Sequence, residues 1–311
     1  MSFSGEIKEE LQLVTGNSRH CQMAELAAYF QFCSRMVEAE NDDKSLRIQT
    51  ENQNVARKCF TLFKKTFKIY VDVTVRRSGA LTGNMTYLLR TDEHPEQKRI
   101  MDAMKISEWE KGDCTSALLL KNSCCKRAFL RGAYLAAGSM SDPYKGYHLE
   151  IVCQNQQQAG QIQKLLLDFG LDAKQVLRKK YYVVYIKEGE NIADFLNIIE
   201  AHQALMEFEN ARIYKDVRNM VNRKVNCDAA NINKTVNAAA RQVEDIEYIR
   251  SSCGLEKLPD SLREMAYVRL ENPEVSLVEL GKLLDPPVGK SGVNHRLRKI
   301  GEFAKSLKDL Q

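Results

Sequence analysis

The C-terminal part of the chain contains amide and cationic side chains of the types that bind a polyanion. The group consists of Lys290, Ser291, Asn294, His295, Arg296, Arg298 and Lys299. Lysine and arginine neutralise phosphates, whereas asparagine pairs well with adenine and arginine with guanine in the major groove. We therefore predict that this segment binds duplex DNA, with the group as a whole assigned to DNA and no single member assigned to a base.

A second group of similar composition lies upstream, in a helix predicted over 194–226. Its polar stripe comprises Lys215, Arg218, Asn222, Arg223 and Asn226, and an apolar stripe at i, i+4 spacing lies opposite: Ile213, Val217, Val221 and Val225. Such amide and cationic groups suit phosphate and base-edge hydrogen bonds. A merely solvated face remains the alternative, but it usually mixes glutamate with lysine, and these positions hold no acid.

The distribution of charge supports both groups. The net charge of +5 is too small to indicate nucleic-acid binding by itself. However, the segments 212–241 and 286–308 are strongly basic, and the segment 242–285 between them is acidic. A polyanion would therefore contact the two basic segments.

The elements predicted around the C-terminal group form a helix-turn-helix. One helix begins at Pro259–Asp260 and ends at Asn272–Pro273, and Ser276 caps a short second helix. The segment 285–290 must be a turn, because two prolines cannot continue a helix. We expect Ser291 to cap the last helix, whose apolar residues recur at helical spacing: Val293, Leu297, Ile300, Ala304 and Leu307. In this motif the second helix enters the major groove, although the turn is longer than usual here.

The first two hundred residues contain an internal repeat. Residues 46–56 and 149–159 share alternating apolar positions followed by a polar turn and a helix. Further strands are predicted over 69–75 and 181–186 from their β-branched and aromatic residues. This order of elements indicates a duplicated α+β scaffold.

A helix rich in small residues precedes each strand pattern, over 24–36 and 126–139. Ala27, Ala28, Gly132 and Ala136 would let the two helix backbones approach closely. Either helix alone would be an ordinary core helix, but two copies in equivalent positions predict a seam between the two halves.

These features together resemble the WhiA family of Gram-positive bacteria, and the resemblance spans essentially the whole chain. It rests on residues 1–4 and 8–11, on 218–228, and on 275–281 with 291–296. The resemblance implies an α+β fold: a duplicated αββαββ scaffold with pseudo-twofold symmetry, like LAGLIDADG homing endonucleases, followed by an all-α helix-turn-helix domain. The expected boundaries are 1–207 for the scaffold, 208–258 for a basic helical linker and 259–311 for the helix-turn-helix. The implied roles are cell division, chromosome segregation and regulation of sporulation genes.

The resemblance also allows a test for nuclease activity. In active LAGLIDADG enzymes the eighth residue of each motif is an acid that binds a divalent metal, and the equivalent positions here are Cys33 and Ala137. Neither side chain supplies the hard oxygen ligand that Mg²⁺ needs. Glu38 and Asp142 lie nearby but beyond the motif. We therefore expect no catalysis, with a surviving metal-dependent nuclease as one rival hypothesis.

The cysteines and the hydropathy pattern bear on cofactors and location. The nine cysteines are scattered without a C-x-x-C motif, which excludes the usual zinc spacings and favours reduced thiols in a cytoplasm. No apolar run is long enough to span a membrane, and the N-terminus does not resemble a signal peptide. We expect a cytoplasmic, nucleoid-associated protein with no cofactor and no metal. A second rival hypothesis is a cell-division scaffold whose N-terminal half binds a protein or ligand, with DNA binding secondary.

Overall fold

The computed structural model describes residues 2–38, 44–77, 85–90, 94–105 and 114–309, and the chain forms two compact units. The first unit comprises residues 1–216 and the second 217–311. Each unit has its own hydrophobic core, so each is described by itself. Among the described residues, no helix is both long and apolar enough to cross a membrane.

The first half of the first unit is a four-stranded antiparallel sheet with helices on it. After α1 (Phe3–Leu13), the elements are α2 (Arg19–Cys33), β1 (Ser34–Glu38), β2 (Lys44–Thr50), α3 (Gln53–Phe67), β3 (Asp72–Arg77), β4 (Met85–Arg90) and α4 (His94–Ala103). The strand order is β1-β2-β4-β3.

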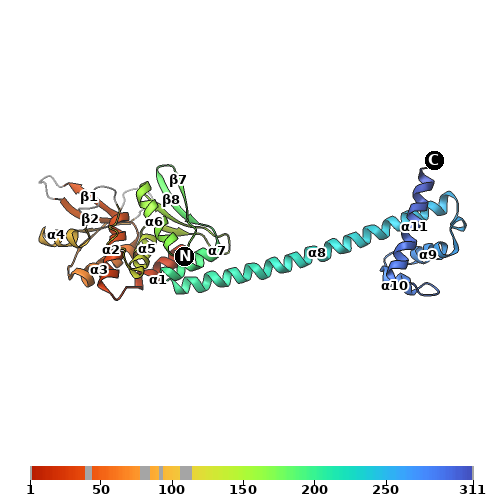
Figure 1. The fold of residues 1–311 in the computed structure, drawn as a ribbon, viewed down its shortest axis with the longest axis horizontal. Helices are drawn as coiled ribbons and strands as arrows, with labels where there is room; N and C mark the ends of the chain where they lie inside the picture. The colour runs from red at the N-terminus through yellow and green to blue at the C-terminus, as the bar shows by residue number, and fades with distance from the viewer. Residues whose placement is uncertain (1, 39–43, 78–84, 91–93, 106–113, 310–311) are drawn as a thin grey trace. The chain divides into compact units, whose positions relative to one another are not determined.

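The second half repeats this topology. Its elements are α5 (Ser123–Ala137), β5 (Gly138–Met140), β6 (Leu149–Cys153), α6 (Gln156–Asp168), β7 (Lys174–Arg178), β8 (Tyr181–Ile186) and α7 (Gly189–Ile198). The strand order, β5-β6-β8-β7, is that of the first sheet shifted by four strands. The predicted α+β duplication is therefore confirmed (Figure 1).

The two halves meet along α2 and α5, which pack closely against each other. Ala27, Ala28 and Gly132 are buried, and Ala136 is half-buried. A Cβ atom added to Gly132 would lie 2.8 Å from the carbonyl oxygen of Glu25 and 2.9 Å from the Cβ atom of Ala28. Glycine is required there because the two backbones are in contact, as the small-residue pattern predicts.

Several predicted boundaries were wrong. The strand predicted over 69–75 begins only at Asp72, because Asp72 pairs with Arg90, the last residue of β4. Ile69 and Val71 lie ahead of the strand and are buried in the core. Its counterpart in the second half is β7, not the strand over 181–186. The motif helices end at Cys33 and Ala137, where β1 and β5 begin.

The helix predicted over 194–226 is two helices. The first is α7, and the second is α8 (His202–Ser252), a single helix of 51 residues. Glu200, at φ +67°, has a left-handed conformation that a continuous helix does not allow. The chain therefore changes direction between Ile198 and His202.

The second unit is all-helical. It combines the end of α8, a short 3-10 helix (Leu255–Lys257), α9 (Asp260–Glu271), α10 (Leu277–Lys282) and α11 (Lys290–Lys308). These helices surround one small core, which includes Ile246, Leu262, Met265, Leu280, Val293, Leu297 and Ile300. The predicted limits of α9 are confirmed, and Ser276 caps α10 in a capping box with Glu279. The predicted cap at Ser291 was wrong, because α11 begins earlier, with Gly289 as its N-cap.

Candidate nucleic-acid interface

The turn between α10 and α11 is long, and it is held against both helices. The backbone N–H of Val288 donates to the carbonyl oxygen of Gly281 at 2.8 Å. A Cβ atom at Gly281 would collide with the Val288 carbonyl, and one at Gly292 would collide with the Val288 side chain. Two glycines therefore allow Val288 to pack between α10 and α11, and this contact sets the position where α11 begins.

One face of α11 packs into the core and the opposite face is exposed. Val293, Leu297, Ile300 and Ala304 form the buried stripe. The exposed face carries Ser291, Asn294, His295 and Arg298 at i, i+3, i+4 and i+7, with Lys290 and Lys299 at its flanks; all six side chains are exposed. Within this unit, six of the seven predicted residues therefore share one surface.

Arg296 is the exception among the predicted residues. It is only partly exposed, and its guanidinium faces α9. Its Nη1 atom donates to the carbonyl oxygen of Ser261 at 3.4 Å and lies 3.6 Å from Oε2 of Glu264. Glu264 also accepts a hydrogen bond from the backbone N–H of Asp285 in the turn, at 3.0 Å. Arg296 and Glu264 thus hold α11 and the turn against α9.

A buried arginine positions α9 in the same unit. Arg269 is 2% exposed, and its Nε atom donates to Oε1 of Gln242 on α8 at 3.0 Å. Its Nη1 atom donates to the carbonyl oxygen of Val275 at 2.7 Å. Burial lowers the pKa of Arg269, but the guanidinium keeps these neutral acceptors. The residue connects α8, α9 and the segment that precedes α10.

The second predicted group lies on α8 and is divided between the two units. Arg218, Asn222, Arg223 and Asn226 belong to the second unit and are exposed. Lys215 belongs to the first unit, and its Nζ atom lies 4.3 Å above the ring centroid of Tyr147. The structure therefore brings four of these five residues together on an exposed part of α8.

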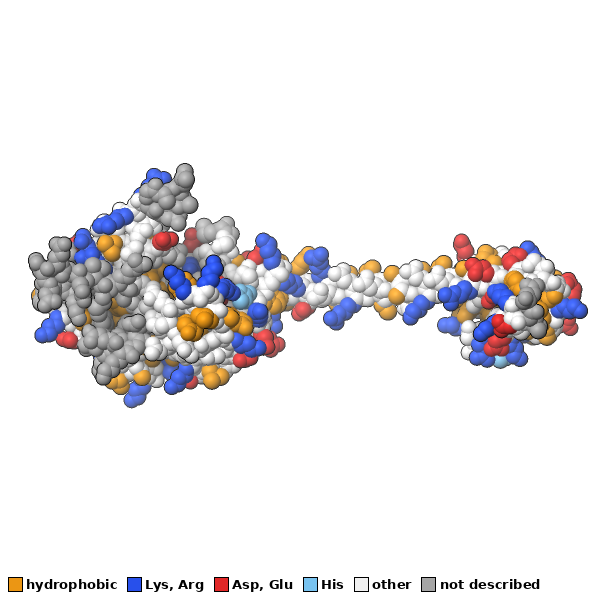
Figure 2. Space-filling model, turned by 90° about the horizontal axis from the view of Figure 1, so that it is seen from above, with side chains coloured by type: hydrophobic (Ala, Val, Ile, Leu, Met, Phe, Trp, Pro, Cys, Tyr) orange, Lys and Arg blue, Asp and Glu red, His pale blue; other side chains and the backbone are white. Residues whose placement is uncertain are grey.

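The apolar stripe of α8 is also exposed. Ile213, Val217, Val221 and Val225 are each about half exposed or more, between 49% and 60%. From residue 217 to residue 238 every described side chain of α8 is exposed. Figure 2 shows hydrophobic and basic side chains side by side along this helix.

The motif helices end at Cys33 and Ala137, the positions where active LAGLIDADG enzymes have their metal-binding acids. Cys33, at the end of α2, is half-buried; burial raises the pKa of its thiol to about 12, although Lys8 and a hydrogen bond with Thr50 act to lower it. Ala137 ends α5. The carboxylate of Asp142 accepts a hydrogen bond from the backbone N–H of Tyr144 at 2.9 Å, which stabilises a turn. The side chain of Glu38 lies outside the described residues.

The sequence reasoning missed a buried ion network at the seam. Glu25, fully buried on α2, lies 3.1 Å from Nη2 of Arg131 on α5 and 3.3 Å from Nζ of Lys58 on α3. The hydroxyl of Tyr29 donates to Glu25 at 3.2 Å, and Arg131 also pairs with Glu200 at 2.7 Å. Burial lowers the pKa of Lys58, and Glu25 opposes that effect. The sequence did contain a sign of this network: Glu25 lies among the apolar residues of a predicted core helix, and a buried acid needs a partner.

Comparison with known proteins gives a consistent result for all parts of the chain. Models of the WhiA N-terminal LAGLIDADG-like domain, the WhiA LAGLIDADG-like domain and the WhiA C-terminal HTH domain match residues 19–107, 126–218 and 221–304. A probable cell division protein WhiA of Lachnoclostridium phytofermentans is 50% identical over 99% of this chain and 100% of that protein. Its counterpart in Desulforamulus reducens is 48% identical over 99% and 97%.

A solved structure has the same architecture. The crystal structure of full-length WhiA from Thermatoga maritima has a TM-score of 0.61 to this chain, at 28% identity, and covers 98% of this chain and 99% of that one. The fold and the matched models define the class: a LAGLIDADG-like scaffold joined to a helix-turn-helix domain. Within that class, this chain belongs to the WhiA family.

Proposed function

We propose that this protein is a non-enzymatic, cytoplasmic and nucleoid-associated DNA-binding regulator, and that α11 is its recognition helix. The observation that carries the proposal is the exposed face of Ser291, Asn294, His295 and Arg298, which lies opposite the buried stripe of the same helix. The relatives are named as probable cell division proteins. For this chain we propose a role in cell division and chromosome segregation, or in the regulation of transcription as in sporulation regulators.

The face of α11 divides into two kinds of contact. Asn294 and Arg298 occupy its centre and suit base edges, with adenine and guanine as their respective partners. Lys290 and Lys299 lie at its flanks and suit phosphates. Lys290 also begins a helix whose first turn contains no acid, and free backbone N–H groups there favour a phosphate.

The exposed stripe of α8 would add phosphate contacts. Arg218 and Arg223 are cations without an acidic partner at the stripe positions, and Asn222 and Asn226 can donate to phosphate oxygens. Such contacts carry no sequence information, so they would raise affinity for any duplex. A strong dependence of binding on salt follows, because each neutralised phosphate releases counterions.

The proposal includes the absence of DNA cleavage. Cys33 and Ala137 replace the two motif acids, and Asp142 is engaged in a turn. Plasmid DNA incubated with the protein and Mg²⁺ or Mn²⁺ should stay intact. Metal-dependent nicking that vanishes on changing Glu38 or Asp142 would overturn this part of the proposal.

The main test uses the full chain and duplex DNA selected from genomic fragments that it binds. Changing Asn294 and Arg298 to alanine should weaken binding by about 1–3 kcal/mol for each side chain that reads a base, and should relax sequence preference. Changing Lys290 or Lys299 should weaken binding to all duplexes alike and reduce the salt slope by about 1. Fluorescence titrations at several salt concentrations measure both quantities.

Two control variants separate recognition from folding. Lys257→Ala removes an exposed cation of the same unit outside α11 and should leave specific binding unchanged. Arg296→Ala should lower the stability of the second unit, because Arg296 holds α11 against α9. If Asn294→Ala and Arg298→Ala leave affinity, preference and salt slope untouched, α11 is not the recognition helix.

A further inference from the structure

Four side chains with soft-metal ligand atoms converge at one end of the seam between α2 and α5. They are His20 and Cys21 in the first turn of α2, and Cys124 and Cys125 in the first turn of α5. Their ligand atoms all lie within 4.8 Å of one another. The sequence analysis did not find this cluster, because the two pairs are far apart in the chain and neither forms a known zinc-binding motif by itself.

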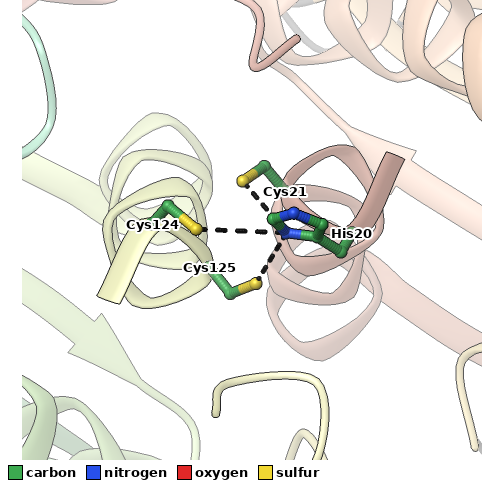
Figure 3. Close-up of side chains that lie close together, drawn as sticks. All are labelled: His20, Cys21, Cys124 and Cys125. Atoms are coloured by element: carbon green, nitrogen blue, oxygen red, sulfur yellow. Dashed lines mark hydrogen bonds between the residues drawn. The ribbon is translucent and has the colours of Figure 1, made fainter. Parts of the chain in front are cut away.

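The arrangement has more sulfur atoms around one nitrogen than hydrogen bonding explains. Nδ1 of His20 lies 3.2 Å from Sγ of Cys125, 3.3 Å from Sγ of Cys21 and 4.0 Å from Sγ of Cys124 (Figure 3). A ring nitrogen has either one proton or one lone pair, so it supports a single good hydrogen bond. An ion between the four atoms would account for all three contacts at once.

We propose that these four residues form a structural zinc site. A tetrahedral ion with Zn–S near 2.3 Å and Zn–N near 2.0 Å keeps its ligand atoms about 3.5–3.8 Å apart. The three separations between His20 Nδ1 and sulfur, 3.2, 3.3 and 4.0 Å, lie on both sides of that range, and all four ligand atoms lie within 4.8 Å of one another. Side-chain movements of about 1 Å would therefore be enough to bind the ion. Three cysteines and one histidine are also a donor set typical of closed, structural zinc sites.

The duplication explains how the site arises from two distant segments. His20 and Cys21 match Cys124 and Cys125 at the same offset that relates Ala28 to Gly132 in the seam. The four ligands therefore occupy equivalent positions of the two motif helices, on either side of the pseudo-twofold relation between the halves. The ion would join the two halves at the helix ends remote from Cys33 and Ala137.

The four ligands lie between the core and the solvent. Cys21 and Cys125 are buried, whereas His20 and Cys124 are exposed, so the ion would be reachable from solvent. A hollow of about 420 Å³ beside the cluster is lined by Cys21, Cys124 and Arg127. Three thiolates around Zn²⁺ leave one negative charge, which Arg127 and the N-terminal ends of both helices would stabilise.

The test begins with the full chain purified under reducing conditions without a chelator. Elemental analysis should find about one zinc ion per chain, as expected for a single four-ligand site. Replacing zinc by Co²⁺ should give the visible and thiolate charge-transfer absorption of tetrahedral cobalt, and added Zn²⁺ should remove it. Chelation should lower the melting temperature, and Zn²⁺ should restore it.

Variants at the two exposed ligands avoid damage to the core. His20→Ala and Cys124→Ser should lose the cobalt absorption and the effect of the chelator on melting. Cys227→Ser, at an exposed cysteine on α8, is the matched control and should behave like the unchanged chain. DNA affinity measured in parallel is expected to be unchanged in His20→Ala and Cys124→Ser, which separates this site from the proposed recognition helix.

Three results would overturn the proposal. The first is a chain that contains no zinc and gives no cobalt spectrum at micromolar metal. The second is a coloured iron–sulfur chromophore bound to the same cysteines. The third is a disulfide among Cys21, Cys124 and Cys125 in the reduced preparation, shown by thiols that stay untitratable after chelation and denaturation.

Discussion

The two units of this protein use their charged side chains in opposite ways. The first unit buries Glu25, Arg131 and Lys58 in a network that connects α2, α3 and α5. The second unit buries one arginine, Arg269, among those that the structure describes, and leaves Lys290, Arg298 and Lys299 of α11 and Arg218 and Arg223 of α8 exposed. Buried charges must be paired or hydrogen-bonded inside the protein, whereas exposed cations are available to a polyanion. The comparison supports the proposed division into a scaffold in one unit and a binding surface in the other.

The largest expected effect is the loss of the buried carboxylate. Glu25→Ala leaves the guanidinium of Arg131 and the ammonium of Lys58 without their shared partner in the core. We expect the free energy of unfolding to fall by about 3–5 kcal/mol, because Lys58 loses its buried carboxylate partner and Arg131 loses one of the two carboxylates that it pairs with. Urea denaturation of the wild-type chain and the variant measures the difference.

A surface pair in the same unit provides the control. Lys126 and Asp168 form a partly exposed ion pair between α5 and α6. Asp168→Ala should cost at most about 1 kcal/mol, since solvent screens such pairs. Equal losses for Glu25→Ala and Asp168→Ala would mean that the buried network has no special role in the seam.

An intermediate effect is expected at the seam itself. Gly132→Ala would place a methyl group 2.8 Å from the Glu25 carbonyl oxygen, and overpacking of this kind costs about 1–3 kcal/mol. Gly160→Ala on α6 meets no atom within 4 Å and should stabilise the chain by about 0.4–1 kcal/mol. Thermal unfolding of both variants tests the close approach, and a neutral Gly132→Ala would contradict it.

The smallest expected effect is the affinity of the first unit alone for duplex DNA. On its sheets Arg47 and Arg90 are register partners, but Asp72 lies opposite Arg90. The carboxylate of Glu150 is paired with His148 and Arg178, each at 3.1 Å. These pairs weaken the positive field of the sheets, although Arg76, Arg77 and Lys174 stay exposed. We expect the chain 1–216 to bind duplex DNA weakly and to lose that binding at physiological salt.

The measurement compares chain 1–216 with the full chain at two salt concentrations, after circular dichroism has shown that the shorter chain is folded. Equal affinity of the two proteins would break the division between scaffold and binding surface. It would also move the DNA-binding surface to the two sheets.

Local sequence patterns were sufficient for the elements and for the duplication. The alternation in β2 and β6, the capping residue Ser276 and the apolar spacing of α11 all depend on residues within about four positions of each other. Local patterns predicted the wrong start for α11. Val288 packs against Gly281 and Gly292, and this tertiary contact determines where the helix begins. Serine is a favoured N-cap residue, so the sequence predicted Ser291 as the cap. In the structure the packing of the turn places Gly289 at the N-cap instead.

The sequence by itself therefore determined a repeated α+β scaffold, a helix-turn-helix and a basic face on its last helix. Only the tertiary structure showed that Arg296 turns toward Glu264, away from the exposed face. It also brought Glu25 to Arg131, and His20 to Cys125, across more than a hundred residues of chain. Contacts of this kind depend on how two helices pack, and helix packing is set by the whole core and not by the spacing of nearby residues.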